Sequence, residues 1–422
     1  MPGEISTILL PSGVLRSSLS PSTVDASTVL DDHCRPALLT IGTCSYLARI
    51  TLVAESFLRH HPAGEIFICL VDRPAHGVPL ALPGTIFSAE ELDLPGGRRF
   101  LFKYEAFELC CALKPYAINY VMQRYAISHL AYLDADILVM KDFWKDLELA
   151  WTTHSILLTP HLTRLPSNTS AEFQRSLVQH GAYNGGFIAL KGGNETKQFL
   201  DCWANLLADG CTFDPMNNTY VDQRWLDLLV PSCESVGVLR DSGLNVAYWN
   251  LHERKLTVDS QGEWAVNDQP VKFFHFSGFD RTCLTTKVKC LDAVAIALAR
   301  YYGDLLEQAG DEQFSAQPYG WDYYVDGTPI LLAHRDLILA RHPEFADVTD
   351  PFDLPQMPDK WQAVEPLASI LSPVRLAQRY HNPAKAEDLL QRLHRHPVVG
   401  LVWKLWSRFV NQSLRHYSRP HV

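Results

Sequence analysis

The chain has 422 residues, of which 47% are hydrophobic and 20% are charged. This composition is typical of globular proteins with a sizeable buried core, and the length suffices for one large domain or two ordinary ones. The formal net charge of −10 argues against nucleic acid as a partner, because domains that bind nucleic acid carry an excess of basic residues.

The ten cysteines form no Cys-x-x-Cys pair and no zinc-type spacing with histidine. We therefore expect reduced thiols that pack as small hydrophobic residues. The N-terminus has no basic start followed by an apolar core, so no secretory signal is predicted. No window approaches the roughly 18 apolar residues of a membrane span. The sequence predicts a cytoplasmic protein, with peripheral contact at the inner membrane surface as an addition.

The first elements along the chain indicate a βαβ unit. Residues 1–36 are rich in Ser, Thr and Pro and predict a flexible leader. A buried strand is expected over 37–43, an amphipathic helix over 46–61 and a second buried strand over 65–72. A strand, a helix and a strand in this order imply parallel pairing in a sheet whose faces are covered.

The rest of the first 300 residues continues this alternation. Residues 101–125 predict helices with a break at Lys114, because Pro115 disfavours helical backbone in the residue before it. Further elements are expected as strands over 129–139, 155–160, 185–190 and 271–279, and as helices around 195–208 and 221–229. We predict an α/β catalytic domain over 37–300 with a mostly parallel sheet, followed by a mainly helical extension over 301–422.

Two carboxylates, Asp134 and Asp136, interrupt the apolar run from His129 to Val139. At i and i+2 of an extended segment, their side chains point the same way, about 7 Å apart. Two such carboxylates repel each other unless a cation lies between them, and Mg²⁺ or Mn²⁺ suits both carboxylate and phosphate oxygens. Because ligands of α/β sheets bind at the carboxyl ends of strands, the residues predict a metal-bridged diphosphate site. A solvated strand edge is the alternative.

The run YLDADILV resembles the Asp-x-Asp strand of GT-A-fold nucleotide-sugar glycosyltransferases, in particular family 8 (the glycogenin and lipopolysaccharide galactosyltransferase type) and related bacterial enzymes. Further segments resemble motifs of that family in the expected order: ELCCALKP, YNGGFIAL, VDQRWLDLL and HFSGFDR. The resemblance covers about residues 37 to 285. It departs from the family at Arg281, where the family has Lys, and in the missing Pro-Trp that follows. The resemblance implies a Rossmann-like GT-A fold.

The resemblance and the local chemistry together suggest roles for individual residues. The expected metal ligands are Asp134, Asp136 and His275. The residues expected to bind the sugar nucleotide are Gly42, Thr43, Tyr46, Lys114, Asp134, Ala135, Gly185, Gly186 and Arg281. The residues expected near the reaction centre are Asn184, Asp222 and Gln223.

Most of these residues also have an ordinary structural role open to them. His275 would serve as a core histidine, Arg281 as a surface arginine and Lys114 as a solvated lysine. Asp222 would serve as a carboxylate favoured by the dipole of a helix N-terminus. Tyr46, expected to stack on a nucleobase, would otherwise only pack against its helix.

The resemblance implies a hexosyltransferase-type glycosyltransferase, metal-dependent with Mn²⁺ or Mg²⁺ and retaining, of the kind that serves polysaccharide biosynthesis. Its donor would be a nucleotide-diphosphate sugar, with a UDP-sugar expected, and its acceptor a glycan, a lipid-linked sugar or a protein. Residues 245–254 are dense in aromatic and amide side chains and are expected to line the acceptor pocket. Two alternatives stay open, a phosphatase that uses Asp-x-Asp and a non-catalytic protein that binds carbohydrate or sugar nucleotide.

The tail over 391–422 has six Lys or Arg residues and no Asp or Glu. Its apolar residues recur at helical spacing, which predicts a basic amphipathic helix able to contact an anionic membrane surface. A helix docked on the protein is the alternative.

Overall fold

The computed structural model describes residues 35–73, 81–164, 169–214, 219–279, 292–330, 334–335 and 348–353. The chain divides into two compact units. Unit 1 comprises the residues up to 92 together with 110–207 and 221–319, and unit 2 comprises 93–109, 208–220 and the residues from 320 onward. The predicted domain boundaries at residues 36 and 300 stay predictions.

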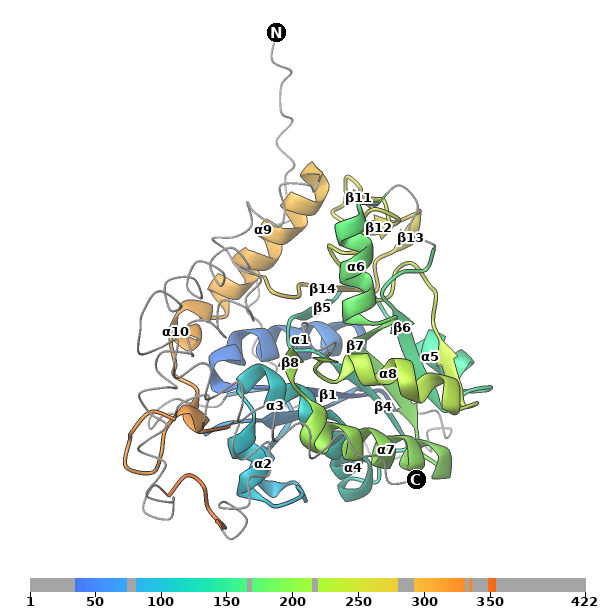
Figure 1. Cartoon of the computed structure of the whole chain (residues 1–422). Coiled ribbons are helices and arrows are strands. Elements are labelled where there is room, and N and C mark those ends of the chain that lie inside the picture. The colour runs from blue at the N-terminus through green and yellow to red at the C-terminus, as the bar shows by residue number, and fades with distance from the viewer. Residues whose placement is uncertain are drawn as a thin grey trace, which may run out of the picture. The chain divides into compact units, whose positions relative to one another are not determined.

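Unit 1 is built on a seven-stranded mixed sheet (Figure 1). Its strands, in spatial order, are β10 (Val236–Val238), β6 (Ile156–Pro160), β7 (Tyr183–Lys191), β4 (His129–Leu133), β1 (Ala37–Gly42), β2 (Glu65–Leu70) and β3 (Thr85–Ser88). Neighbouring strands pair in parallel except that β7 runs antiparallel to both β4 and β6. The mostly parallel α/β sheet predicted from the sequence is confirmed.

Helices cover both faces of this sheet, which is why its central strands read as continuous apolar runs. Every residue of β1 is buried. On one face, α1 (Leu47–His60) buries an apolar stripe against Leu38, Ile68 and Leu133. On the other face, α4 (Lys114–Arg124) and its C-terminal Tyr125 cover the sheet, and the rings of Tyr125 and Phe67 lie 4.9 Å apart.

Further elements belong to unit 1. They are η1 (Cys44–Tyr46), η2 (Ala89–Glu91), β5 (Ile137–Val139), α5 (Trp144–Ala150), α6 (Ala171–His180), α7 (Asn194–Gly210, whose last residues belong to unit 2), α8 (Gln223–Leu229), η4 (Val230–Ser232), β11 (Leu256–Val258), β12 (Trp264–Val266), β13 (Gln269–Pro270), β14 (Phe273–His275), α9 (Ala293–Gln308) and α10 (Asp311–Ser315). The helices α9 and α10 confirm helical structure at the start of the predicted extension. The predicted tail helix lies outside the described residues.

Two element predictions need correction. The expected single strand over 129–139 is two strands, β4 and β5, separated by a turn in which the Ile137 N–H donates to the Asp134 carbonyl at 3.1 Å. The chain turns here because β5 leaves the large sheet and pairs with β14 instead. The expected strand over 271–279 is ordered as a strand only over Phe273–His275, the residues that pair with β5.

Unit 2 contains α2 (Arg98–Lys103), most of α3 (Ala106–Ala112), the short pair β8 (Phe213–Asp214) and β9 (Thr219–Tyr220), and η5 (Gly320–Asp322). The buried Arg335 ties it together. Its guanidinium donates to the carbonyls of Phe102, Tyr104 and Trp321 and pairs with Asp322 at 2.8 Å. Burial of such a cation is tolerated because these four hydrogen bonds give both of its Nη groups acceptors.

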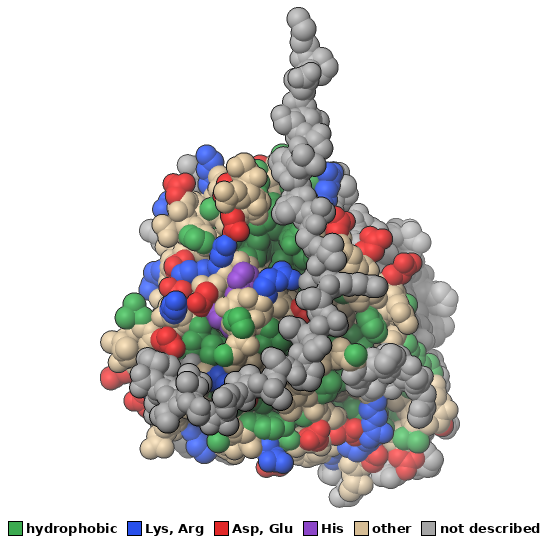
Figure 2. All heavy atoms as spheres, turned by 180° about the vertical axis from the view of Figure 1, so that it is seen from behind, with side chains coloured by type: hydrophobic (Ala, Val, Ile, Leu, Met, Phe, Trp, Pro, Cys, Tyr) green, Lys and Arg blue, Asp and Glu red, His purple; other side chains and the backbone are tan. Residues whose placement is uncertain are grey.

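Among the described residues, none of the helices combines the length and the apolar character needed to cross a membrane. Figure 2 shows one face of the molecule, on which acidic, basic and hydrophobic side chains are interspersed. The basic tail predicted to contact a membrane lies outside the described residues, so that contact stays a prediction.

Candidate active site at the turn after β4

Two strand pairings bring distant residues together at the turn between β4 and β5. In the antiparallel pair of β5 and β14, His275 lies opposite Ile137. The Phe276 N–H donates to the Asp136 carbonyl at 2.9 Å, which extends this pairing by one residue. On the β7 side, the Asp134 N–H donates to the Gly186 carbonyl at 2.9 Å. The sheet therefore places Asp134 and Asp136 beside His275 and the Gly-Gly segment.

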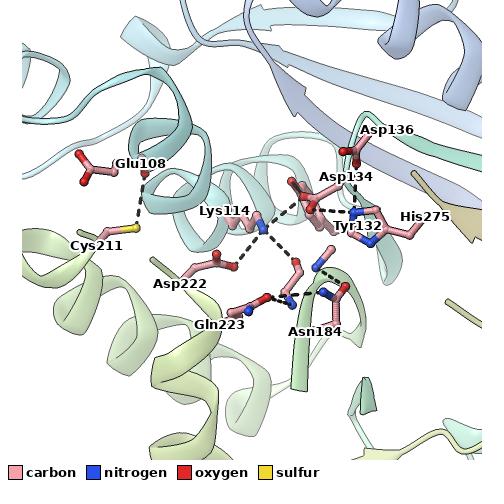
Figure 3. Close-up of polar contacts among 12 residues, drawn as sticks. Glu108, Lys114, Tyr132, Asp134, Asp136, Asn184, Cys211, Asp222, Gln223 and His275 are labelled. Atoms are coloured by element: carbon pink, nitrogen blue, oxygen red, sulfur yellow. Dashed lines mark hydrogen bonds and ion pairs between the residues drawn. The ribbon is translucent and has the colours of Figure 1, made fainter. Parts of the chain in front are cut away.

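The three side chains predicted as metal ligands form one cluster (Figure 3). The His275 Nε2 lies 3.1 Å from the Asp136 Oδ1 and 3.8 Å from the Asp134 Oδ2. One potential ligand atom from each residue lies within 4.8 Å of the other two. Two carboxylate oxygens and one imidazole nitrogen at such spacing are a donor set that suits a divalent cation.

The orientation of His275 also fits a metal ligand. Its Nδ1 lies 3.3 Å from the Asn245 Oδ1, which directs the Nδ1 proton to that oxygen and leaves Nε2 facing the two carboxylates. Burial lowers the pKa of His275, but the carboxylates of Asp136 and Asp134 together raise it, and the net shift is upward. Burial raises the pKa of Asp136, but His275 and Arg49 together lower it, and the net shift is downward.

Asn245 fixes this arrangement. Its amide nitrogen donates to the Thr159 hydroxyl at 2.8 Å and to the Asn184 Oδ1 at 2.9 Å, so its own oxygen is the group that faces His275. Its backbone is in the left-handed region with φ of 51°, which asparagine tolerates better than most residues. We did not expect this supporting role from the sequence, although Asn245 stands at the start of the amide-rich 245–254 segment.

Lys114 is buried beside the cluster and joins two carboxylates. Its Nζ lies 2.9 Å from the Asp222 Oδ2, 3.2 Å from the Asp134 Oδ1 and 2.9 Å from the Gly185 carbonyl oxygen. Burial lowers the pKa of Lys114, but Asp134 and Asp222 raise it well above its ordinary value. An ammonium group has three protons, and these three acceptors match them, so in this arrangement Lys114 is directed at the protein. Its expected contact with the donor stays a prediction.

Tyr132 is a further member of the site that the sequence analysis did not identify. Its hydroxyl donates to the Asp134 Oδ1 at 2.6 Å, and its ring lies 5.0 Å from the Lys114 Nζ. Tyr132 and Asp134 are at i and i+2 of the strand and its extension, so they share a face. That spacing is visible in the sequence and was the available signal. The effect is to fix the Asp134 carboxylate from two sides.

The residues expected near the reaction centre form a connected polar group. Asp222, 1% exposed, precedes α8, and the preceding Val221 has φ of 39°, an uncommon conformation for a β-branched residue. Burial raises the pKa of Asp222 more than Lys114 lowers it. The Gln223 Oε1 accepts from the Gly185 N–H at 3.3 Å, and its amide donates to the His180 carbonyl at 2.9 Å. The structure therefore brings Asn184, Asp222 and Gln223 together against the Gly-Gly segment.

The two glycines of this segment are required by close packing. A Cβ on Gly185 would lie 2.5 Å from the Asp222 Oδ2, and a Cβ on Gly186 would lie 2.4 Å from the His275 Cε1. Both distances are shorter than real side chains permit. The glycines, which lie within β7, thus allow Asp222 and His275 to approach its backbone directly.

We expect Gly186→Ala to displace the imidazole of His275, to cost about 1–3 kcal/mol of folding free energy through overpacking, and to weaken Mn²⁺ binding. Urea denaturation and calorimetric Mn²⁺ titration measure the two effects. Gly193→Ala is the matched control, because a Cβ there meets no atom within 4 Å. Equal stability and Mn²⁺ affinity in both variants would show that the contact with His275 is not essential.

The other residues expected to bind the sugar nucleotide differ in how they lie relative to Asp134, Asp136 and His275. Tyr46, 39% exposed, carries the Arg49 guanidinium over its ring at 4.5 Å. Arg49, which we did not predict as a member of the site, is one of the groups that lower the pKa of Asp136. Gly42 ends β1, and the Thr43 hydroxyl bonds to Ser45 at 2.8 Å, so neither is directed at the carboxylates by a described contact. Ala135, which lies between Asp134 and Asp136 in the sequence, is buried. Arg281 lies outside the described residues.

His161 supports Asn184 as a neutral side chain. Its Nδ1 donates to the Gly181 carbonyl at 2.8 Å, and its Nε2 lies 3.4 Å from the Asn184 amide nitrogen. Burial lowers the pKa of His161 to about 4. In the unfolded chain the pKa is about 6.5, so the unfolded state binds the proton first as the pH falls.

We therefore expect the chain to lose stability between pH 6.5 and pH 4, with His161 contributing up to about 1.4 kcal/mol per pH unit. Urea denaturation of the wild type and His161→Gln at several pH values measures this contribution. The variant should show the shallower dependence on pH. Parallel curves for the two proteins would contradict the assignment of a buried neutral imidazole.

Comparison with known proteins gives distant relatives. No family model matches the chain. The Bacillus subtilis protein YfnD, described as uncharacterized, is 24% identical over 254 residues, which is 59% of this chain and 78% of YfnD. The uncharacterized protein YfnF of the same organism is 24% identical over 177 residues, which is 41% of this chain and 57% of YfnF.

Solved structures similar to the chain include the galactosyltransferase LgtC in complex with donor and acceptor sugar analogs, at 15% identity and a TM-score of 0.38, covering 68% of this chain and 98% of LgtC. Another is the glycosyltransferase GlyE of Streptococcus pneumoniae, at 13% identity and a TM-score of 0.38, covering 68% of this chain and 66% of GlyE. Likenesses of this degree do not assign an activity, which depends on the side chains around Asp134 and Asp136.

Proposed function

We propose that the protein is a metal-dependent glycosyltransferase of the GT-A type, which moves a hexose from a nucleotide-diphosphate sugar, with UDP as the expected nucleotide, to a glycan or lipid-linked acceptor. In this reaction the bond from the anomeric carbon to the diphosphate breaks. A bond to an acceptor hydroxyl oxygen forms, and the hydroxyl proton is released. The observation that carries the proposal is the cluster of Asp134, Asp136 and His275 at the carboxyl end of β4.

The donor set of the cluster fits a divalent cation. Asp134, Asp136 and His275 would hold it, and Mn²⁺ suits the imidazole better than Mg²⁺ does. A bound cation would supply positive charge that stabilises the departing nucleoside diphosphate. The orientation of His275 favours cation binding. Its Nδ1 lies beside the Asn245 Oδ1, which leaves Nε2 facing the two carboxylates.

The chain's own residues would hold the donor around this cluster. Lys114 balances the charge of Asp134 and Asp222 and so fixes the Asp134 carboxylate. The Gly185–Gly186 backbone carries no side chains, which lets Asp222 and His275 pack directly against it. The side-chain amides of Asn184 and Gln223 belong to the same hydrogen-bonded network. Amides suit the hydroxyls of a donor sugar, because they both donate and accept hydrogen bonds. Asp222 is buried, so we assign it a positioning role through Lys114.

The retaining outcome rests on the family resemblance, and it is tested by the anomeric configuration of the product in proton NMR. A product with the same configuration as the donor sugar is expected. An inverted product would leave sugar transfer intact and overturn the retaining assignment.

A thermal-shift screen of sugar nucleotides, with and without Mn²⁺, tests the proposed function. A ligand that binds only the folded state stabilises it by about 2.7 kcal/mol at 100 times its Kd. We expect an upward shift of Tm with a sugar nucleotide plus Mn²⁺ and a smaller shift when EDTA is added. Release of inorganic phosphate from phosphomonoesters, with no response to sugar nucleotides, would instead support the phosphatase alternative. Binding without transfer or hydrolysis would support the non-catalytic one.

A further inference from the structure

A cavity of about 380 Å³ lies in unit 1. A cavity of this size falls in the range of small-molecule sites. It is lined by the segment before α6 and its first turn, by the segment after Ala247, and by the start of α9. The lining residues are Thr169, Ser170, Phe173, Tyr248, Trp249, Leu251, His252, Arg254, Leu256, Asp292 and Ala295. These residues carry none of the roles assigned above to the metal or to the donor.

The cavity adjoins the metal cluster through two consecutive aromatic residues. The Trp249 ring lies 5.3 Å from the ring of His275, at 81°. The ring of Tyr248 lies 5.1 Å from that of Trp249. Both residues line the cavity. A ligand in it would therefore lie beside the cluster, as the second substrate of a transfer reaction must.

The wall of the cavity suits a sugar ring. Phe173, Tyr248, Trp249 and His252 present aromatic rings, and those of Phe173 and His252 lie 5.1 Å apart at 76°. Aromatic faces pack against the apolar face of a pyranose, while its hydroxyls need polar partners. Ser170 offers one. Its Oγ accepts from the Phe173 N–H at 3.1 Å, and the hydroxyl can still donate its own proton.

The charges in the wall favour a neutral ligand over a phosphate. Arg254 donates through Nη1 to the carbonyls of Ser242 and Leu244 at 3.0 and 2.7 Å, and its Nε lies 3.6 Å from the Glu253 carboxylate. The Asp292 carboxylate accepts from the Ala295 N–H at 2.9 Å. One basic and one acidic side chain line the cavity, so their charges balance and provide no excess of positive charge for a diphosphate.

We propose that this cavity binds the terminal sugar ring of a neutral glycan acceptor, with Tyr248 and Trp249 as its stacking wall. The inference rests on the proposed sugar transfer and deepens it by naming the class of the acceptor. It also gives the predicted role of residues 245–254 a defined location, in the cavity and beside His275.

Saturation-transfer NMR tests the inference directly. The probes are methyl β-glucoside, methyl β-galactoside and lactose, each with the full chain in the presence of UDP and Mn²⁺. We expect saturation of the ring protons of at least one glycoside. Tyr248→Ala should weaken that binding by roughly fivefold or more, since an aromatic contact of this kind is lost, and Tyr248→Phe should retain most of it. Tyr323→Ala is the matched control, because Tyr323 is 40% exposed, as Tyr248 is, and lies in unit 2.

Calorimetric titration of UDP with Mn²⁺ in the same proteins separates the two proposals. UDP binding that is unchanged in Tyr248→Ala, with glycoside binding weakened, supports an acceptor site. UDP binding that is lost in Tyr248→Ala, with glycoside binding intact, would assign the cavity to the donor and overturn the inference. Normal UDP binding with no glycoside signal would overturn the inference and leave the proposed function standing. Absence of UDP binding to the wild type would overturn both.

Discussion

Replacing Asp134 or Asp136 by alanine is expected to reduce Mn²⁺-dependent turnover of a sugar nucleotide by roughly a hundredfold or more, since even indirect supports of metal ligands commonly contribute 10–100-fold. The fold should survive, because Lys114 keeps Asp222 and the Gly185 carbonyl as partners when Asp134 is removed, and His275 keeps Asn245 when Asp136 is removed. Turnover is measured as release of the nucleoside diphosphate, and folding by near-ultraviolet circular dichroism.

Asp201→Ala is the control for these two variants. Asp201 is an exposed aspartate on α7 that pairs with Lys197 at 2.6 Å, and it should not affect turnover. If Asp134→Ala and Asp136→Ala both stay fully active, the carboxylate pair is not the metal site. If they lose their native circular dichroism, Asp134→Asn and Asp136→Asn, which keep the size of the side chain, separate folding from metal binding.

Replacing Lys114 by methionine is expected to lower the free energy of unfolding by about 3–5 kcal/mol, the usual cost of removing one partner of a buried ion pair. The Asp222 carboxylate and the Gly185 carbonyl would both lose a buried donor. Urea denaturation measures the change. Lys197→Met, in the exposed pair with Asp201, should change the same quantity by less than about 0.5 kcal/mol.

A double-mutant cycle identifies the cause of the loss at Lys114. Because Asp222→Asn removes the charge that Lys114 neutralises, the variant with both substitutions should lose less stability than the sum of the two single variants. Additive losses would show that Lys114 and Asp222 do not stabilise each other.

The sequence predicted the elements whose signals are local. The βαβ unit, a helix break beside Lys114 and the mostly parallel sheet follow from apolar runs, helical spacing and Pro115. The break lies at Leu113, because α4 begins at Lys114, and a second break between α2 and α3 was not predicted. The turn between β4 and β5 was missed because its apolar letters continue on both sides of Asp134 and Asp136. Only the pairing of β5 with β14, which is far along the chain, shows that the strand has ended.

The site was predictable as a set of residue types but not as a set of contacts. Asp134, Asp136 and His275 could be proposed together because the resemblance placed them in one motif series. The hydrogen bond from Asn245 to Asn184, and the closeness of Gly186 to His275, depend on how separate strands pack, which a pattern in one segment does not contain. The sequence also could not show that Lys114 would meet three acceptors at once.

Calorimetric titration of a nucleoside diphosphate into the protein, with Mn²⁺ and then with EDTA, tests the central claim most directly. The metal-dependent donor site predicts one binding site per chain, with affinity that is lost in EDTA and in His275→Gln. Tight binding that persists unchanged in EDTA and in His275→Gln would contradict it, because the donor would then be held without the cluster of Asp134, Asp136 and His275.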